Sequence, residues 1–275
     1  MGSPEIGQTI DAGGIATNVH VRGNGRPVVL LHGSGPGVTA WANWRLTIPA
    51  LAERGFKVIA PDAVGFGYTQ RPADNAYGKE RWLAHLDGVL DALDLGEVDL
   101  VGNSFGGAMA LAYAATRPER VRRLVLMGAV ATSFPITEGL DRVWGYEPSI
   151  ANMKGLLDVF AYDRRLVNDE LAQLRYEASI RPGFHESFSA MFPAPRQRWV
   201  DALATDESII RELPQRTLVV HGREDKVIPL SASLRLAELL PEVELHVFGK
   251  CGHWTQIEHA ARFVDVVASF FSNDD

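Results

Sequence analysis

The stretch LVGNSFGG at residues 100–107 constrains the fold of this chain more than any other. It holds the pattern G-x-S-x-G around Ser104, and an apolar run before it and small residues after it predict a buried strand followed by a helix. A serine at such an abrupt turn takes a strained, positive-φ backbone, and the helix passes so close to the strand that side chains do not fit on either side. Gly102 and Gly106 meet this need. The pattern therefore predicts a nucleophile elbow.

Further apolar runs, alternating with helical segments, predict an α/β fold with a mostly parallel sheet covered on both faces. Residues 133–214 break this alternation, because they show helical periodicity, frequent prolines and no strand pattern. We expect them to form a helical cap over the carboxyl ends of the strands, inserted between two parts of the core, 1–132 and 215–275. The expected strands cover residues 8–11, 17–22, 27–32, 57–62, 98–101, 121–127, 217–222 and 243–248.

Composition excludes several classes of protein. The chain has 275 residues, 46% hydrophobic and 22% charged, as is typical of a soluble globular protein. Its net charge of −7 argues against a nucleic-acid partner, and no apolar run approaches the roughly 20 residues that span a membrane. The amino-terminal residues lack the pattern of a secretory signal, and a single cysteine, Cys251, suits a reducing compartment. We expect a cytoplasmic protein without nucleic-acid or membrane partners.

Three residues complete a hydrolytic site. A serine hydroxyl is a poor nucleophile at neutral pH and needs a base, which needs an orienting acid. Ser104, Asp225 and His253 occur in the chain order typical of this kind of elbow, and each follows a predicted strand. Glu224 remains an alternative acid. The glycine-rich loop at 32–37 is expected to supply a backbone amide that acts with the amide of Phe105 as an oxyanion hole.

Competing interpretations of the same residues are weaker. The loop at 32–37 lacks the spacing G-x-G-x-x-G of a dinucleotide site. His253, Glu258 and His259 do not have the spacing that places metal ligands on one helical face, so we expect no metal and no cofactor. Asp62 is interpreted as a residue that holds its loop by local hydrogen bonds, and Cys251 as a structural residue.

Three segments together resemble one family across nearly the whole chain. HGSGPGVTAWANW at 32–44, GNSFGG at 102–107 and CGHW at 251–254 resemble the meta-cleavage product hydrolases. These are α/β-hydrolases with a helical cap that break a carbon–carbon bond in ring-opened products of aromatic catabolism. The resemblance is nearest to the branch that acts on 2-hydroxymuconic semialdehyde and its 6-alkyl relatives. It implies that a 2-hydroxy-6-oxohexa-2,4-dienoate is hydrolysed to 2-hydroxypenta-2,4-dienoate and a carboxylic acid, and that the protein is a homo-oligomer.

The resemblance also implies which residues hold the substrate. The amides of Ser34 and Phe105 would form the oxyanion hole. The polar partners of the substrate's carboxylate and 2-oxygen would be Asn43, Asn103, Arg181 and Trp254, although Arg181 is placed only by the short motif Ile180-Arg181-Pro182. In the alternative interpretation, Arg181 is a solvated arginine before a proline that starts a helix.

Two other functions remain open at this point. A carboxylesterase or perhydrolase on the same scaffold would share the three catalytic residues but would not need Asn43 and Arg181 as carboxylate partners. A ligand receptor with little turnover would need none of the catalytic chemistry. A brisk reaction with simple aryl esters would favour the first of these.

Overall fold

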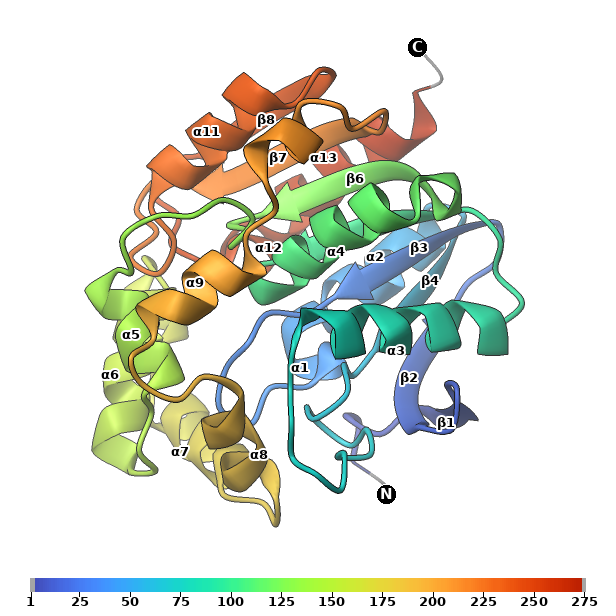
Figure 1. Cartoon of the computed structure of the whole chain (residues 1–275). Helices are drawn as coiled ribbons and strands as arrows, with labels where there is room; N and C mark the ends of the chain where they lie inside the picture. Colours follow the sequence, from blue (N-terminus) through green and yellow to red (C-terminus); the bar gives the residue numbers. More distant parts are fainter. Residues whose placement is uncertain (1–2, 274–275) are drawn as a thin grey trace.

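The computed structural model describes residues 3–273, and its centre is an eight-stranded sheet in the order β1-β2-β4-β3-β5-β6-β7-β8. The strands from β4 to β8 run parallel, whereas β2 is antiparallel to both β1 and β4 (Figure 1). This arrangement confirms the predicted α/β fold with a mostly parallel sheet. The strands are β1 (Gln8–Asp11), β2 (Ala16–Arg22), β3 (Arg26–Leu31), β4 (Phe56–Pro61), β5 (Val98–Asn103), β6 (Val121–Met127), β7 (Arg216–Gly222) and β8 (Val243–Phe248).

The inner strands are apolar throughout because both faces of the sheet are covered. In β3, Val29 belongs to the hydrophobic core on one face, whereas Val28 and Leu30 belong to the core on the other. One face carries α3, α4 and α11, and the opposite face carries α1, α2 and α13. These helices are α1 (Ala40–Trp44), α2 (Thr47–Glu53), α3 (Lys79–Ala92), α4 (Phe105–Thr116), α11 (Leu230–Leu239) and α13 (Ala260–Ser272).

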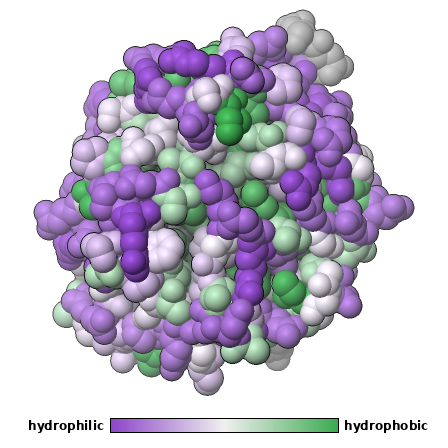
Figure 2. Space-filling model, in the orientation of Figure 1, coloured by the Kyte–Doolittle hydropathy of each residue, from purple (hydrophilic) through white to green (hydrophobic). Residues whose placement is uncertain are grey.

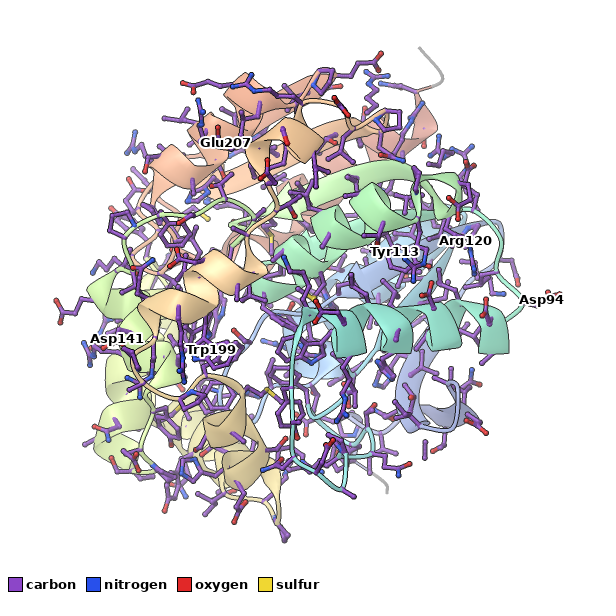
Figure 3. All side chains as sticks on the ribbon, in the orientation of Figure 1. Asp94, Tyr113, Arg120, Asp141, Trp199 and Glu207 are labelled. Atoms are coloured by element: carbon purple, nitrogen blue, oxygen red, sulfur yellow. The ribbon has the colours of Figure 1, made fainter. Side chains whose placement is uncertain are left out.

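Between β6 and β7 the chain forms helices and, within the described residues, no strand. We call α5 to α9 the cap. In Figure 1 the cap lies beside the sheet, on the side toward which the arrowheads of β3 and β6 point, and Figure 3 labels Asp141 on α5 and Trp199 on α9. The next helix, α10, contacts α11 of the core. The helices of this segment are α5 (Glu138–Trp144), α6 (Ile150–Phe160), α7 (Asp169–Ser179), α8 (Phe184–Met191), α9 (Gln197–Leu203) and α10 (Glu207–Ile210).

The carboxyl-terminal segment differs from its prediction. The sequence pattern predicts one helix over 256–271, but the structure has a short helix α12 (Thr255–Glu258) and then α13, with a break at His259. At the break, His259 takes a non-helical backbone with φ −125° and ψ 41°. The break turns the chain so that α13 packs Phe263, Val267 and Phe271 into the core under the sheet.

The face of the molecule drawn in Figure 2 is mostly polar. Figure 2 shows mostly hydrophilic side chains on the face that it draws, with small apolar areas between them. Within residues 3–273, none of the helices combines the length and the apolar character that crossing a membrane requires.

Candidate active site

Ser104 stands on the predicted strained turn. It lies between β5 and α4 with φ 55° and ψ −113°, a conformation that few residues other than glycine adopt. A Cβ atom on Gly102 would lie 2.3 Å from the Gly106 oxygen, and one on Gly106 would lie 2.2 Å from the Leu31 oxygen. The two glycines are therefore required by close backbone contacts, as the sequence predicted. The turn presents the serine hydroxyl at the carboxyl end of the sheet.

His253 and Asp225 form a buried pair. His253 Nδ1 lies 2.7 Å from Asp225 Oδ2, and the two side chains are 3% and 1% exposed. Asp225 Oδ1 accepts hydrogen bonds from the amides of Val227 at 2.7 Å and Ile228 at 3.0 Å. Burial alone would raise the pKa of Asp225, but the imidazoles of His253 and His221 and these amides hold the pKa below its ordinary value. An ionised Asp225 orients the Nδ1–H of His253 and leaves Nε2 free to accept a proton.

Ser104 and the His253–Asp225 pair both lie at the end of β6. The amide of Ser104 donates to the Met127 oxygen at 2.8 Å. The next residue, Gly128, faces the pair so closely that a Cβ atom there would lie 3.2 Å from both Asp225 Oδ2 and His253 Nδ1. The structure thus brings Ser104, Asp225 and His253 to one end of the sheet.

The alternative acid, Glu224, has a different task. Its carboxylate accepts a hydrogen bond from the amide of Cys251 at 2.9 Å and pairs with Arg223. Glu224 thus anchors the loop before His253, whereas Asp225 contacts the imidazole itself. Cys251 is fully buried, and burial raises the pKa of its thiol to about 12, in agreement with a structural role.

The two residues expected to form the oxyanion hole lie next to Ser104 in the sequence or in a loop that packs close to it. The amide of Phe105 is in the first turn of α4, where an N–H group has no acceptor within the helix. Ser34 lies in the loop after β3, and its neighbour Gly33 packs so closely that a Cβ atom there would be 3.4 Å from Ser104 Cβ. The cap fixes this loop, because Trp144 Nε1 donates to Ser34 Oγ at 2.9 Å.

A small cavity of about 40 Å³ opens between this loop and the cap. We call it the inner pocket. Polar groups from the core and apolar groups from α6 share its wall, so that it suits a ligand with a polar and an apolar part. Its wall includes Ser34, Asn43, Asn103, Met153, Leu157, Phe160, Arg175, His253 and Trp254.

Two asparagines provide polar contacts in the inner pocket. Asn43 Nδ2 donates to Asn103 Oδ1 at 3.3 Å, and Asn103 Nδ2 donates to the Met127 oxygen at 3.4 Å. Asn43 Oδ1 is buried and has no hydrogen-bond partner among the described residues. A buried acceptor without a partner costs free energy, so this atom is well suited to accept a ligand hydroxyl.

The aromatic wall joins core and cap. Trp254 stacks on Phe160 at 4.9 Å between ring centroids, and His253 stacks on the same ring at 6.0 Å. The amide of His253 donates to the Phe160 oxygen at 2.7 Å. The last residue of α6 therefore contacts both the imidazole of His253 and the ring of Trp254.

The structure does not bring Arg181 to the inner pocket. Arg181 pairs with the Glu5 carboxylate, and its guanidinium lies over the rings of Tyr68 and Phe184 at 5.6 and 5.8 Å. Proline follows it, but α8 begins only at Phe184, after Gly183 with φ 78°. Arg181 therefore does not belong to the wall of the inner pocket, and its expected contact with the substrate's carboxylate stays a prediction.

The arginine that lines the inner pocket is Arg175 on α7. Its Nη2 donates to the Pro36 oxygen at 3.2 Å, and burial lowers its pKa. The sequence held a signal for it, because Arg175 lies four residues after Leu171 and three before Ala178, on the face of α7 that the apolar residues define. A charged residue on an apolar helix face is a candidate for ligand binding.

Glu258 is a second residue whose role the sequence did not reveal. Glu258 Oε2 accepts hydrogen bonds from the amides of Tyr162 and Asp163, both at 2.8 Å, and Oε1 accepts one from the amide of Gly252, also at 2.8 Å. The carboxylate thus ties the end of α6 to the loop that carries His253. Burial raises its pKa, although the three amides oppose that shift.

Other residues keep structural roles. Asp62 accepts hydrogen bonds from the amides of Ala40 at 2.6 Å and Tyr68 at 2.9 Å and from Asn18 Nδ2 at 2.8 Å, which confirms that it holds its loop. Within residues 3–273, no group of three or more histidine, cysteine, aspartate or glutamate side chains is placed to hold a metal ion.

Comparisons with known proteins agree with this geometry. The family model described as alpha/beta hydrolase fold matches residues 26–260. The chain is 66% identical to the 2-hydroxymuconate semialdehyde hydrolase of Pseudomonas sp. (strain CF600) over 99% of this chain and 96% of that protein. It is 63% identical to the 2-hydroxy-6-oxo-2,4-heptadienoate hydrolase of Pseudomonas putida F1, covering 98% of each chain.

A solved structure matches nearly the whole chain. It is a serine-to-alanine mutant of the meta-cleavage product hydrolase CumD from Pseudomonas fluorescens IP01, complexed with acetates. The two chains are 60% identical, the TM-score is 0.98, and the match covers 99% of this chain and 100% of the other.

Proposed function

This chain belongs to the α/β-hydrolase family and, within it, to the meta-cleavage product hydrolases, and from that premise we propose how its residues act on the substrate. The enzyme hydrolyses the C5–C6 bond of 2-hydroxy-6-oxohexa-2,4-dienoates, which are ring-fission products of aromatic catabolism. The products are 2-hydroxypenta-2,4-dienoate and a carboxylic acid. The relatives named for the semialdehyde and for the heptadienoate, at 66% and 63% identity, support substrates with hydrogen or methyl at carbon 6.

The carboxylate of the substrate binds at Arg175. The observation that carries this proposal is the position of Arg175, whose side chain lines the inner pocket together with Asn43, Asn103 and Trp254. A guanidinium and a carboxylate form a charge-assisted pair worth roughly 1.5 to 3 kcal/mol. Asn43 Oδ1, which has no hydrogen-bond partner among the described residues, accepts a hydrogen bond from the 2-hydroxyl group. A simple ester needs neither contact.

The first chemical step moves a proton from the 2-hydroxyl oxygen to carbon 5. The resulting 2,6-diketone keeps one carbon–carbon double bond, between carbons 3 and 4. His253 carries the proton through Nε2, because its Nδ1 is engaged by Asp225 at 2.7 Å. The step is needed because the electrons of the C5–C6 bond can later pass through the double bond onto the ketone oxygen at carbon 2.

In the second step His253 removes the proton of the Ser104 hydroxyl, and the oxygen adds to carbon 6. The negative charge on the carbonyl oxygen is stabilised by the amides of Ser34 and Phe105, each worth on the order of a hundredfold in rate. When the carbonyl re-forms, the C5–C6 bond breaks and the dienolate takes a proton from His253. Water then hydrolyses the serine ester. If His253 instead activates water directly, the same oxyanion hole serves that reaction.

Residues 133–214 are proposed to act as one lid unit. Trp144, Phe160 and Arg175 of this segment support this role, because each contacts or lines the site from the cap side. Their contacts exclude water from the reacting atoms, which strengthens the electrostatic interactions inside.

The chain is also proposed to form a homo-oligomer in the cytoplasm. The edge strand β8 supports association, because Leu245 and Val247 are each 37% exposed there and one side of an edge strand has unpaired backbone groups. Sedimentation velocity of the wild type and of Val247→Lys tests the first part. The free and buried Cys251 supports a reducing compartment.

The assay uses dienoates that carry hydrogen, methyl, isopropyl or phenyl at carbon 6 and follows the loss of the yellow dienolate colour. The rates are compared with the rate of hydrolysis of p-nitrophenyl acetate. We expect the dienoates with hydrogen or methyl to have the highest kcat/KM. Rapid turnover of the ester, with no turnover of any dienoate, would contradict the proposal and favour a carboxylesterase.

A further inference from the structure

A second and larger cavity adjoins the inner pocket. It has a volume of about 330 Å³, and we call it the outer chamber. Val38, Asn43, Arg175 and Trp254 belong to the walls of both cavities. The two spaces are therefore neighbours, and Arg175 lies in the wall of each of them.

The wall of the outer chamber carries an excess of positive charge. Arg45, Arg175 and Arg181 supply three guanidinium groups, and Glu5 is the acidic residue of the same wall, so the balance among these four residues is two positive charges. Arg45 is bonded to a backbone oxygen, since its Nη1 donates to the Ala42 oxygen at 2.8 Å. A walled cavity with charge of one sign concentrates ligands of the opposite sign.

The rest of the wall is largely apolar. Leu166, Leu171 and Leu174 lie in it, and Leu174 is 57% exposed, although the sequence pattern of α7 places it on the apolar face. A cavity with guanidinium groups at some points and leucines at others suits an anion that carries a hydrocarbon chain. A conjugated dienoate has this character.

Glu5 occupies part of this positive site. Its carboxylate pairs with Arg181. Its backbone is held separately, because the Glu5 oxygen accepts hydrogen bonds from Asn18 Nδ2 at 3.0 Å and from the His20 ring at 3.2 Å. The carboxylate of Glu5 can therefore leave Arg181 by rotation of its side chain while the segment stays attached to β2.

We propose that the outer chamber is a transit site for the carboxylate of the dienoate, in which Arg181 and Arg45 hold the anion before and after Arg175 does, and Glu5 is a built-in competitor for Arg181. This inference rests on the proposed function, since it takes the dienoate as the ligand. It gives Arg181 a role outside the inner pocket.

Two substitutions that break the same ion pair test this proposal. If Glu5 and Arg181 only stabilise the fold, Glu5→Gln and Arg181→Gln both lower activity or leave it unchanged. If the chamber attracts the carboxylate, the two variants have opposite effects, because one removes the competitor and the other removes the binding group. Arg165→Gln is the matched control, since Arg165 is an 89% exposed arginine of the same segment that pairs with Asp163.

The measurement is kcat/KM for the methyl-substituted dienoate divided by kcat/KM for the uncharged p-nitrophenyl acetate, at about 20 and 300 mM salt. At low salt we expect this ratio to fall about three- to tenfold in Arg181→Gln and less in Arg45→Gln, and to rise about two- to fivefold in Glu5→Gln. High salt should reduce all three differences, and Arg165→Gln should match the wild type. Thermal melting identifies any variant that is not folded.

The outcomes are distinguishable. Changes of the same sign in Glu5→Gln and Arg181→Gln, or ratios equal to that of the wild type, overturn the transit site while leaving the proposed function intact. Absence of dienoate hydrolysis in the wild type itself would instead contradict the proposed function.

Discussion

The core and the cap contribute to the candidate active site by different means. In the core, the proposed catalytic groups are fixed by backbone geometry, namely the positive φ of Ser104, the close contacts of Gly102 and Gly106 and the amides that hold Asp225. The cap contributes side chains such as Arg175 and Trp144, together with one backbone group, the Phe160 oxygen that accepts a hydrogen bond from the amide of His253. The groups proposed for the chemistry therefore lie at the ends of strands, whereas the group proposed to bind the substrate's carboxylate lies on a helix of the cap.

Removal of the core hydroxyl should have the largest effect. We expect Ser104→Ala to lower kcat/KM for the dienoate by a factor on the order of 10⁴ or more, because the nucleophile is lost while the pocket remains. Conversion of the dienol to the ketone, observed as a fast spectral change, should still occur, because it needs His253 and does not need the serine hydroxyl. The exposed Ser231 gives the control Ser231→Ala. Wild-type turnover by Ser104→Ala would remove this serine from the mechanism.

A cap substitution should act on binding instead of chemistry. We expect Arg175→Gln to raise KM for the dienoate by about 10- to 100-fold, since a charge-assisted pair with the carboxylate is lost, and to change kcat less. Arg181→Gln should raise KM by a smaller factor. Steady-state kinetics of both variants measure kcat and KM and show which of the two arginines contributes more to binding of the dienoate. If Arg181→Gln has the larger effect on KM, the carboxylate site lies elsewhere than we place it.

The junction between core and cap should show an intermediate effect. Glu258→Gln loses acceptor capacity toward the amides of Tyr162, Asp163 and Gly252, so the loop with His253 should shift. We expect kcat to fall about tenfold with little change in KM, because the base is displaced and the carboxylate site is not. The exposed Glu238 supplies the control Glu238→Gln. A large rise in KM at constant kcat would show that Glu258 serves binding and not the position of His253.

The smallest effect concerns stability against pH. In the core, burial lowers the pKa of His85 to about 4, and its ring nitrogens contact Thr17 Oγ1 at 2.8 Å and the amide of Val64 at 3.3 Å. Between pH 6.5 and 4 the unfolded state therefore binds a proton that the folded state does not. Each unit of acidification in this window should cost up to about 1.4 kcal/mol of unfolding free energy.

The variant His85→Gln removes the difference in proton binding between the unfolded and the folded state at this position. Its unfolding free energy should therefore depend less steeply on pH than that of the wild type. Urea unfolding at pH 7, 6 and 5 measures the difference, and His185→Gln in the cap serves as the control. Equal slopes for the wild type and His85→Gln would show that His85 does not stay neutral in the folded state.

The sequence by itself determined the elements that local chemistry dictates. The turn at Ser104 follows from glycines that no other residue can replace, and the inner strands follow from apolar runs that only a doubly covered sheet can bury. The chain order of Ser104, Asp225 and His253 predicted that these three side chains lie close together, because each follows a strand and parallel strands end at the same edge of the sheet. The resemblance predicted the reaction, and relatives at 60% identity or more confirm it.

The position of the Arg181 side chain, in contrast, follows from the folded structure and not from the sequence. Arg175 and Arg181 are six positions apart in the same segment, yet one lines the inner pocket and the other pairs with Glu5. Arg175 lies on the apolar face of α7, as the sequence pattern indicates, whereas Arg181 lies in the connection between α7 and α8, where no helical periodicity predicts the direction of a side chain. The ion pair with Glu5 holds the Arg181 side chain, and because the two residues are 176 positions apart, this contact exists only in the folded chain.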